Sequence, residues 1–190
     1  MEKPLFSNQT FDKLTNHENP IPFGEFESCT FKNCDFSNFN LSNYNFTDCN
    51  FINCNLSNAI LTKTAIRNAY FENCKLLGLH FYNCNEFLLS FHFKNCQLNL
   101  ASFYKLKLKK IVFDTCNLNE VDFSDCDLTQ SAFINCDLNR ALFENTNLEK
   151  ADLRSAYNFS ISPELNKIKQ AKFSTNNIIG LLHSYNIQVE

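Results

Sequence analysis

The sequence predicts an all-β solenoid in which the chain turns a corner every five residues. Large apolar residues recur at every fifth position, a spacing that matches neither the 3.6-residue period of a helix nor the two-residue period of a strand. The position two residues before each of them is small or thiol-bearing more often than not, and the other three positions are mostly polar. Two of every five side chains are therefore expected to point inwards.

The repeat runs through most of the 190 residues in two frames. Twelve successive fifth positions from Phe26 to Phe81 are Phe, Leu or Ile, and all 14 from Leu88 to Leu153 are Phe or Leu. Because the frames differ by two residues, the segment 84–90 is expected to contain a two-residue insertion. Self-similarity at a fixed short period is typical of solenoids, in which each unit packs on its neighbours.

The five-residue unit resembles that of the pentapeptide-repeat family, whose consensus is A(D/N)LXX. The units ADLRS (residues 151–155) and CDLNR (residues 136–140) fit this pattern as they stand, and the resemblance covers residues 24–155. It implies a right-handed quadrilateral β-helix in which four units make one coil of 20 residues. Each unit then supplies one of the four sides of the coil.

A coil of 20 residues, or 22 across the insertion, stacks like residues on like. One column of stacked positions is entirely Phe, and a second runs from Phe26 through Ile66 and Leu88 to Leu148. Neighbours one coil apart would lie about 4.8 Å from each other, which is the spacing of paired strands. The all-Phe column contains Phe31, Phe51, Phe71, Phe93, Phe113 and Phe133.

The two ends of the chain lie outside the repeat and are expected to cap it. Residues 1–23 are predicted to be an N-terminal cap and lead-in, and residues 156–190 a short C-terminal helical capping module. Ser162 and Pro163 predict the start of a first helix, and residues 178–185 a second, with a final strand at 187–189. The tail resembles that of the quinolone-resistance (Qnr-type) branch of the family, which implies a homodimer through the residues Phe173, Ile178, Ile179, Leu181, Leu182 and Tyr185.

The residues indicate no catalytic chemistry. All ten Cys occupy small inward positions at spacings of 5, 20 or 22, which suit buried packing rather than the paired spacings of a zinc site or the geometry of a disulfide. The four His have no Cys, Asp or Glu partner at a catalytic spacing, and no phosphate-binding or nucleophile motif occurs. We expect no enzyme activity, no metal, no cofactor and no small-molecule substrate.

The start of the chain and its net charge restrict where the protein acts. No basic segment is followed by an apolar run, and no apolar stretch approaches 18 residues, which predicts a cytoplasmic protein that does not bind membranes. The net charge of −3 gives no basic signal, so direct nucleic-acid binding is not expected.

The charges are nevertheless segregated along the chain. The segment 105–110 contains four lysines, whereas residues 113–152 carry nine acids against Arg140 and Lys150. All nine acids occupy outward positions of the repeat and are expected to lie on all four sides. They are Asp114, Glu120, Asp122, Asp125, Asp127, Asp137, Glu144, Glu149 and Asp152.

This acidic segment has about the linear charge density of duplex DNA, so it could imitate DNA in a basic groove. The Qnr-type resemblance implies the same function, since those relatives are described as DNA mimics that bind the type II topoisomerases gyrase and topoisomerase IV and protect them from quinolones. Some relatives use long projecting loops; here only the insertion, with Glu86 and Phe87, could serve as a second contact. The alternative is a non-enzymatic scaffold with an unrelated partner, in which Lys105–Lys110 could matter as much as the acids.

Overall fold

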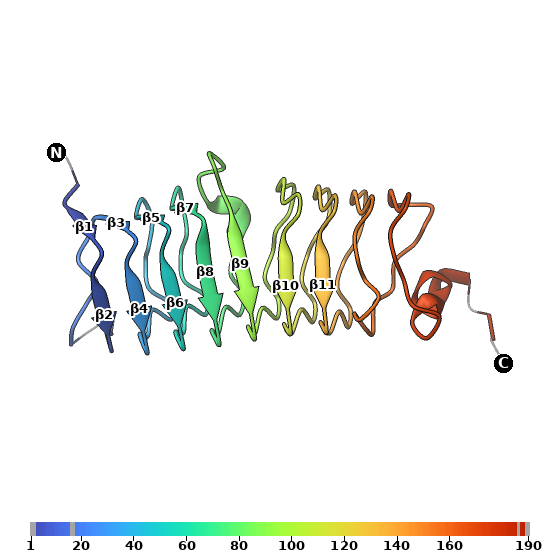
Figure 1. Cartoon of the computed structure of the whole chain (residues 1–190), viewed down its shortest axis with the longest axis horizontal. Helices are drawn as coiled ribbons and strands as arrows, with labels where there is room; N and C mark the ends of the chain where they lie inside the picture. The colour runs from blue at the N-terminus through green and yellow to red at the C-terminus, as the bar shows by residue number, and fades with distance from the viewer. Residues whose placement is uncertain (1–2, 16–17, 186, 189–190) are drawn as a thin grey trace. The chain divides into compact units, whose positions relative to one another are not determined.

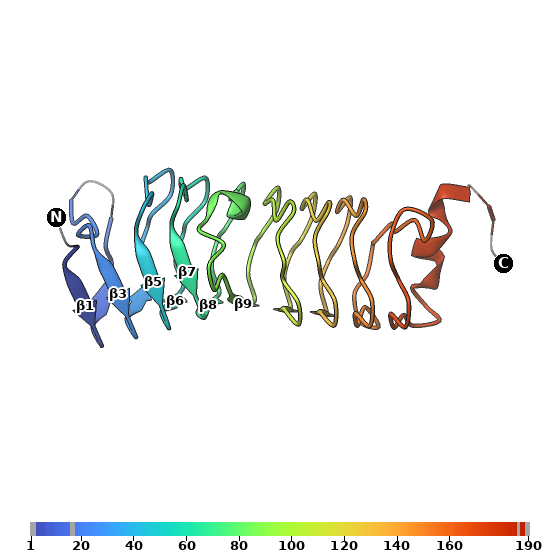
Figure 2. The same ribbon diagram turned by 90° about the horizontal axis from the view of Figure 1, so that it is seen from above.

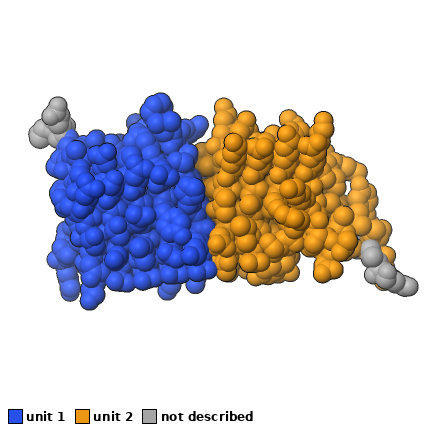
Figure 3. Space-filling view, viewed as in Figure 1, with its two compact units in different colours: residues 1–97 blue, residues 98–190 orange. Residues whose placement is uncertain are grey.

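The computed structural model describes residues 3–15, 18–185 and 187–188. The chain divides into two compact units, residues 1–97 and 98–190, which are coloured separately in Figure 3. Within each unit successive coils pair in parallel, so the predicted all-β solenoid is confirmed. No helix in the described part of the chain has the length and apolar composition needed to cross a lipid bilayer.

Unit 1 pairs its short strands in two parallel sheets on neighbouring sides of the coil (Figures 1 and 2). Paired residues are 20 apart, as in Phe26 with Phe46, and 22 apart where Phe71 pairs with Phe93 across the insertion. The elements of unit 1 are β1 (Leu5–Ser7), β2 (Thr10–Asp12), β3 (Glu25–Glu27), β4 (Thr30–Lys32), β5 (Asn45–Thr47), β6 (Asn50–Ile52), β7 (Ala65–Arg67), β8 (Ala69–Glu72), the 3₁₀ helix η1 (Phe81–Asn83) and β9 (Phe91–Lys94).

Stacked phenylalanine rings fill the interior of unit 1. The ring centroids of Phe31 and Phe51 lie 4.9 Å apart, those of Phe51 and Phe71 lie 4.8 Å apart, and both pairs are within 12° of parallel. Each such pair contributes about 0.5–1.5 kcal/mol beyond its burial. The all-Phe column predicted from the 20-residue coil is thus confirmed within this unit.

Unit 2 continues the same repeat with fewer strands. Its strands β10 (Val112–Asp114) and β11 (Ala132–Ile134) pair in parallel with Phe113 opposite Phe133, and the two rings stack at 5.3 Å. Its other sides pair through single bridges. Two 3₁₀ helices, η2 (Ile178–Leu181) and η3 (His183–Tyr185), follow the last coil.

The corners require a backbone conformation that few residues favour. The last residue of nearly every five-residue unit has a positive φ, as in Asn53 (54°) and Asn58 (57°). Asn adopts this left-handed conformation at lower cost than most other residues, and 12 of the 27 non-glycine positions with positive φ are Asn. This accounts for a chain rich in Asn that turns so often with only three Gly.

The predicted start of the solenoid at residue 24 is too late. Strands β1 and β2 pair with β3 and β4 in the register of the repeat, and the rings of Phe6 and Phe11 stack on Phe26 and Phe31 at 5.0 and 5.1 Å. The N-terminal segment is therefore a further coil. A polar segment interrupts the five-residue pattern in this coil, and the structure describes that segment from Glu18 onwards.

The insertion also departs from the predicted register. Leu88 has a positive φ of 59° and is 65% exposed, so it is wrongly placed in the inward column. Phe91 is buried in its stead and packs edge-to-face on Phe81 at 5.0 Å. The two extra residues loop out between η1 and β9, and the frame recovers at Phe93.

The first predicted C-terminal helix does not form. Residues 163–165 make a turn, Asn166 points inwards, and Lys167 and Lys172 bridge to Asn147 and Asp152 as another coil would. The helix signal at Ser162 and Pro163 was overridden because the solenoid edge offered these residues parallel partners. The helical cap is confirmed only as η2 and η3, residues 187–188 form no strand, and Val189 lies outside the described residues.

Candidate interaction surface

The cysteines are structural donors inside the coils. All ten are buried and free, and at eight of them the thiol contacts the carbonyl oxygen two residues earlier. Most also contact a carbonyl of the preceding coil, as Cys54 does with Phe31 at 3.4 Å. The hydroxyl groups of Thr64 and Thr146 donate hydrogen bonds to the equivalent carbonyl oxygens of the preceding coil, with O···O distances of 2.7 and 2.9 Å. The small inward position thus selects a compact hydrogen-bond donor.

Burial favours the protonated form of three of these thiols. It raises the pKa of Cys49, Cys84 and Cys126 to about 12 in each case. Among the described residues no group of three or more His, Cys, Asp or Glu side chains is arranged to hold a metal ion. The interior therefore offers packing and hydrogen bonds, and the outer surface is the place to look for a function.

The sequence-predicted acids lie on all four sides of unit 2, and none of them is buried. We name each side after its central buried residue. The Phe113 side carries Asp114 and Asp152; the Leu118 side carries Glu120 and Asp137; the Phe123 side carries Asp122, Asp125 and Glu144; the Leu128 side carries Asp127 and Glu149.

Three of the nine acids are held in ion pairs. Lys109 Nζ lies 3.3 Å from Asp127 Oδ2, Arg154 Nη2 lies 2.6 Å from Asp152 Oδ2, and Arg140 approaches Glu120 at 3.9 Å. Arg154 lowers the pKa of Asp152. Burial alone would raise the pKa of Asp127. Hydrogen bonds from Thr129 and from Lys109 outweigh this effect, so the net result is a lowered pKa for Asp127 as well.

Several of the acids also have a local structural role. The carboxylates of Asp122 and Asp137 accept the backbone N–H two residues later at 2.9 and 3.1 Å, and Asn55 and Asn147 make the same contact elsewhere. This Asx turn needs an acceptor oxygen but no charge. The (D/N) position of the repeat is thus explained by turn geometry, whereas a preference for Asp over Asn is not.

Basic residues make the four sides of unit 2 electrostatically unequal, which the sequence did not reveal. The Phe123 side carries Glu164 as well as its three acids and is opposed only by Lys105, giving a net charge of −3. The Leu118 side has a net charge of −1 and the Phe113 side of zero. The Leu128 side carries six lysines against two acids, a net charge of +4. The 20-residue register could have revealed this inequality, because it places lysines that are 40 and 60 positions apart on the same side.

The insertion presents an apolar tip on unit 1. Phe87 is 67% exposed, and its N–H donates to Asn85 Oδ1 at 2.9 Å. The Arg67 guanidinium lies 5.9 Å from the centre of the Phe87 ring. Glu86 and Phe87 are therefore both exposed, as a contact site requires, and they lie on a different unit from the nine acids.

The C-terminal cap closes the last coil through two residues that the sequence analysis missed. Asn177 Nδ2 donates to the carbonyls of Leu153 and Ala156, both at 2.8 Å. Gly180 leaves no room for a Cβ, which would lie 2.5 Å from Phe159. Of the predicted dimer residues, Ile178 and Tyr185 are about half exposed, while Phe173, Ile179, Leu181 and Leu182 are partly covered.

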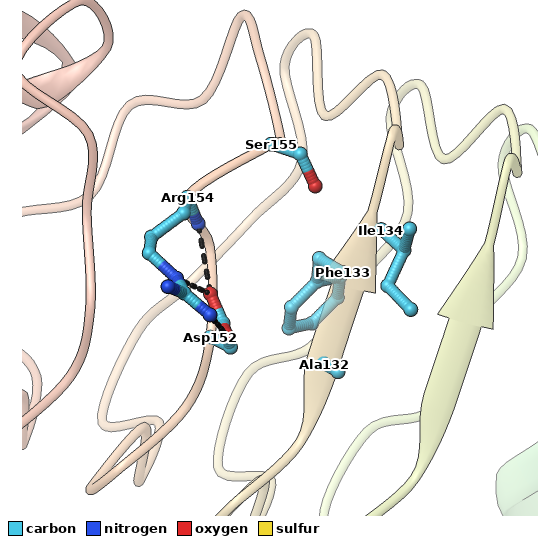
Figure 4. A pocket seen from close by; sticks show the side chains of 6 residues that line it. All are labelled: Ala132, Phe133, Ile134, Asp152, Arg154 and Ser155. Atoms are coloured by element: carbon cyan, nitrogen blue, oxygen red, sulfur yellow. Dashed lines mark hydrogen bonds and ion pairs between the residues drawn. The ribbon is translucent and has the colours of Figure 1, made fainter.

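Two surface grooves illustrate what the gaps between coils offer. The one in Figure 4, of about 410 Å³, lies between two coils on the Phe113 side. Its guanidinium from Arg154 is folded onto Asp152, with Nε 3.0 Å from Oδ1, so acid and base neutralise each other. The Ser155 hydroxyl accepts the Asn135 N–H at 3.1 Å. A second groove of about 330 Å³ on unit 1 is lined by amides, with Asp35, Lys75 and two thiols.

Comparisons with known proteins agree with this fold. A family model described as a pentapeptide repeat region matches residues 24–87 and 86–157. No curated protein sequence matches the chain. Two trypsin-treated variants of QnrB1, a plasmid-mediated fluoroquinolone resistance protein, are similar in structure, with TM-scores of 0.63 and 0.62, 18% identity, all of this chain covered, and 99% and 100% of theirs. HetL, involved in heterocyst differentiation regulation in the cyanobacterium Nostoc sp. strain PCC 7120, matches at 0.41 with 15% identity over 92% of this chain and 84% of its own.

Proposed function

This chain belongs to the pentapeptide-repeat family, and from that premise we propose that it is a non-enzymatic cytoplasmic protein that binds a type II topoisomerase by imitating DNA. Gyrase and topoisomerase IV are the proposed partners. The observation that supports this most is the unequal charge of the sides of unit 2. Two neighbouring sides, those of Leu118 and Phe123, form the acidic surface, with Glu120, Asp122, Asp125, Asp137, Glu144 and Glu164.

The charge density of this acidic surface fits the proposal. Its six acids face Lys105 and Arg140, which leaves a net charge of −4. These residues extend over about three coil spacings, roughly 14 Å, and one strand of duplex DNA carries about four charges over that length. The Leu128 side would be repelled by a basic groove and is expected to face away from it. Within unit 2, the acidic surface is therefore the proposed contact.

Amide substitutions test the charge without disturbing the turns. Asp122→Asn and Asp137→Asn keep the acceptor oxygen of the Asx turn, and Asp125→Asn suits the positive φ of 58° at that position. We expect the triple variant to bind gyrase at least tenfold more weakly. The matched control is Asp12→Asn, Asp35→Asn and Asp48→Asn, which removes the same charge from unit 1 and should leave affinity within about twofold.

The assay is competition between the protein and duplex DNA for purified gyrase over a salt series. A DNA mimic is displaced by DNA and loses affinity as ionic strength rises. Equal affinity of both triple variants would contradict the proposal. Binding that neither DNA nor salt affects would favour the alternative, a scaffold with an unrelated partner. Glu86→Gln with Phe87→Ala tests the insertion as a second contact in the same assay.

We also propose that two chains associate through the C-terminal cap. Ile178 and Tyr185 are 50% and 51% exposed, and Ile187 beyond them is 54% exposed. Exposed apolar side chains that gather in one patch are typical of interfaces, and these three belong to one short terminal segment. The expected mass by sedimentation equilibrium is twice the chain mass of 22.0 kDa, and Ile178→Lys with Ile187→Lys should give the monomer. A wild-type monomer at all concentrations would contradict the dimer.

A further inference from the structure

The Leu128 side of unit 2 has a charge opposite to that of the protein as a whole. It comprises the five-residue units 106–110, 126–130, 146–150 and 166–170. Backbone hydrogen bonds and bridges stack these units, as from Lys107 to Asp127 and from Asn147 to Lys167. Its six lysines are Lys107, Lys109, Lys110, Lys150, Lys167 and Lys169.

The ammonium groups of this side are available to a partner. All six lysines are exposed. Lys109 is paired with Asp127, whereas the other five form no ion pair or side-chain hydrogen bond with any residue that the structure describes. The remaining acid, Glu149, lies on the same side as Lys150 and leaves the net charge at +4. Like charges are gathered here without internal compensation, which raises the affinity for a polyanion.

The chemistry of the side indicates which polyanion it fits. No aromatic residue occurs in its four units, so it offers no surface on which unpaired bases could stack, as single-strand binders require. Its lysines are flexible point charges spread over about three coil spacings, roughly 14 Å, which suits contact with several successive phosphates. An acidic protein would need complementary apolar contacts, and apart from the aliphatic lysine stems this side offers only the partly exposed Ile168.

We propose that the Leu128 side binds the phosphate backbone of duplex DNA without sequence preference. This differs from the expectation drawn from the net charge of −3, which averages sides of opposite sign. The proposal is independent of the topoisomerase. If both hold, the protein presents a DNA-like surface on the Leu118 and Phe123 sides of unit 2 and a DNA-binding surface on the Leu128 side.

The experiment measures binding of the full chain to a fluorescent random-sequence duplex of about 30 base pairs at low salt, by anisotropy. Five unpaired lysines predict a plot of log K against log salt with a slope of about −4 to −5. Lys107→Gln, Lys110→Gln, Lys150→Gln, Lys167→Gln and Lys169→Gln together should lower the affinity at least tenfold and bring the slope close to zero.

A charge-matched control variant distinguishes an effect of the Leu128 side from an effect of the net charge of the protein. Lys32→Gln, Lys63→Gln, Lys75→Gln, Arg140→Gln and Lys172→Gln remove the same charge from exposed positions elsewhere and should leave the affinity within threefold. Equal loss in both variants, or no binding by the wild type, would overturn the proposal. Tighter binding to single-stranded DNA or to poly-glutamate than to the duplex would also overturn it.

Discussion

Unit 1 and unit 2 are built from the same five-residue repeat but close their corners differently. In unit 1, nine strands lie on two neighbouring sides, and the corners after Phe26, Phe31, Phe46 and Phe51 have no turn hydrogen bond. In unit 2 most corners are closed by such a bond, as from Ala101 N–H to Leu98 O at 2.9 Å. The corners after Phe113, Phe133 and Phe143 stay open, and the two strands of unit 2, β10 and β11, contain the first two of these residues.

The residue at the small inward position accounts for much of this difference. Cysteine lies at most of the open corners, where its thiol contacts the carbonyl oxygen two residues earlier, as Cys49 does with Thr47 at 3.4 Å. Cys84 and Cys126 are the exceptions, since both lie at closed corners. Alanine lies at many closed ones, such as Ala141 and Ala151. An open corner leaves three residues extended for strand pairing. One repeat therefore tolerates two corner geometries, while its outward positions are free to take up charge.

The largest effect is expected in the reactivity of three buried thiols, two in unit 1 and one in unit 2, which should be equally low. Burial raises the pKa of Cys49 and Cys84 in unit 1 and of Cys126 in unit 2 to about 12. An ordinary thiol has a pKa near 8.5, so at pH 8 these three should react about 10³-fold more slowly than in the unfolded chain. Titration with an aromatic disulfide, followed by peptide mapping, checks this. Fast labelling of Cys126 alone would show that unit 2 is less well sealed.

The next largest effect concerns the aromatic stack. Phe51→Ala removes a ring stacked on both neighbours and should lower the free energy of unfolding by about 3–5 kcal/mol. Leu128→Ala removes a buried side chain from unit 2 without losing any ring stacking, and should cost about 2–3 kcal/mol. Urea unfolding measures both. A larger loss for Leu128→Ala would contradict the expected contribution of ring stacking to the stability of unit 1.

A smaller effect is expected at the two kinds of corner. Cys54→Ala removes a thiol that shares its hydrogen between two carbonyl oxygens at an open corner, while Cys126→Ala removes one that donates to Phe103 O at a closed corner. We expect losses of about 1–2 kcal/mol, larger for Cys54. Cys54→Thr should recover part of the loss, because Thr64 and Thr146 use a hydroxyl at the equivalent position. Equal losses at both corners would argue against a special role for cysteine.

The smallest effect is expected where the outward charges change. Asp122→Asn, Asp125→Asn and Asp137→Asn keep the turn geometry and should shift the free energy of unfolding by less than about 0.5 kcal/mol each. The same urea measurement serves as the folding control for the binding assay. A loss of several kcal/mol would mean that the carboxylates are structural, and the charge argument would lose its support.

The fold was predictable because the five-residue spacing of large apolar residues is visible directly in the sequence. Phe51 pairs with Phe31 and Phe113 pairs with Phe133, each 20 residues away, as a coil of four units requires. Three features were not predictable from it. The coil containing Phe6 and Phe11 is set off by a loop that breaks the period, Leu88 is displaced by Phe91 in the insertion, and Ser162 and Pro163 give a helix signal that parallel pairing overrides.

The surface was predictable only in part. The nine acids are outward, as expected from their positions in the repeat. Which of them are neutralised depends on cations one coil away, such as Lys109 beside Asp127, or two residues away, such as Arg154 beside Asp152. The lysines of the Leu128 side come from units up to 60 residues apart, so only the coil register brings them together.

The central claim is that the acidic surface takes the place of DNA on a type II topoisomerase. The most direct test is DNA supercoiling by purified gyrase, with and without a quinolone, in the presence of the wild type, the acidic-surface triple variant or the unit 1 control variant. We expect the wild type and the control to inhibit supercoiling or to rescue it from the drug at low micromolar protein, and the triple variant to do neither. No effect of the wild type, or an equal effect of all three proteins, would contradict it.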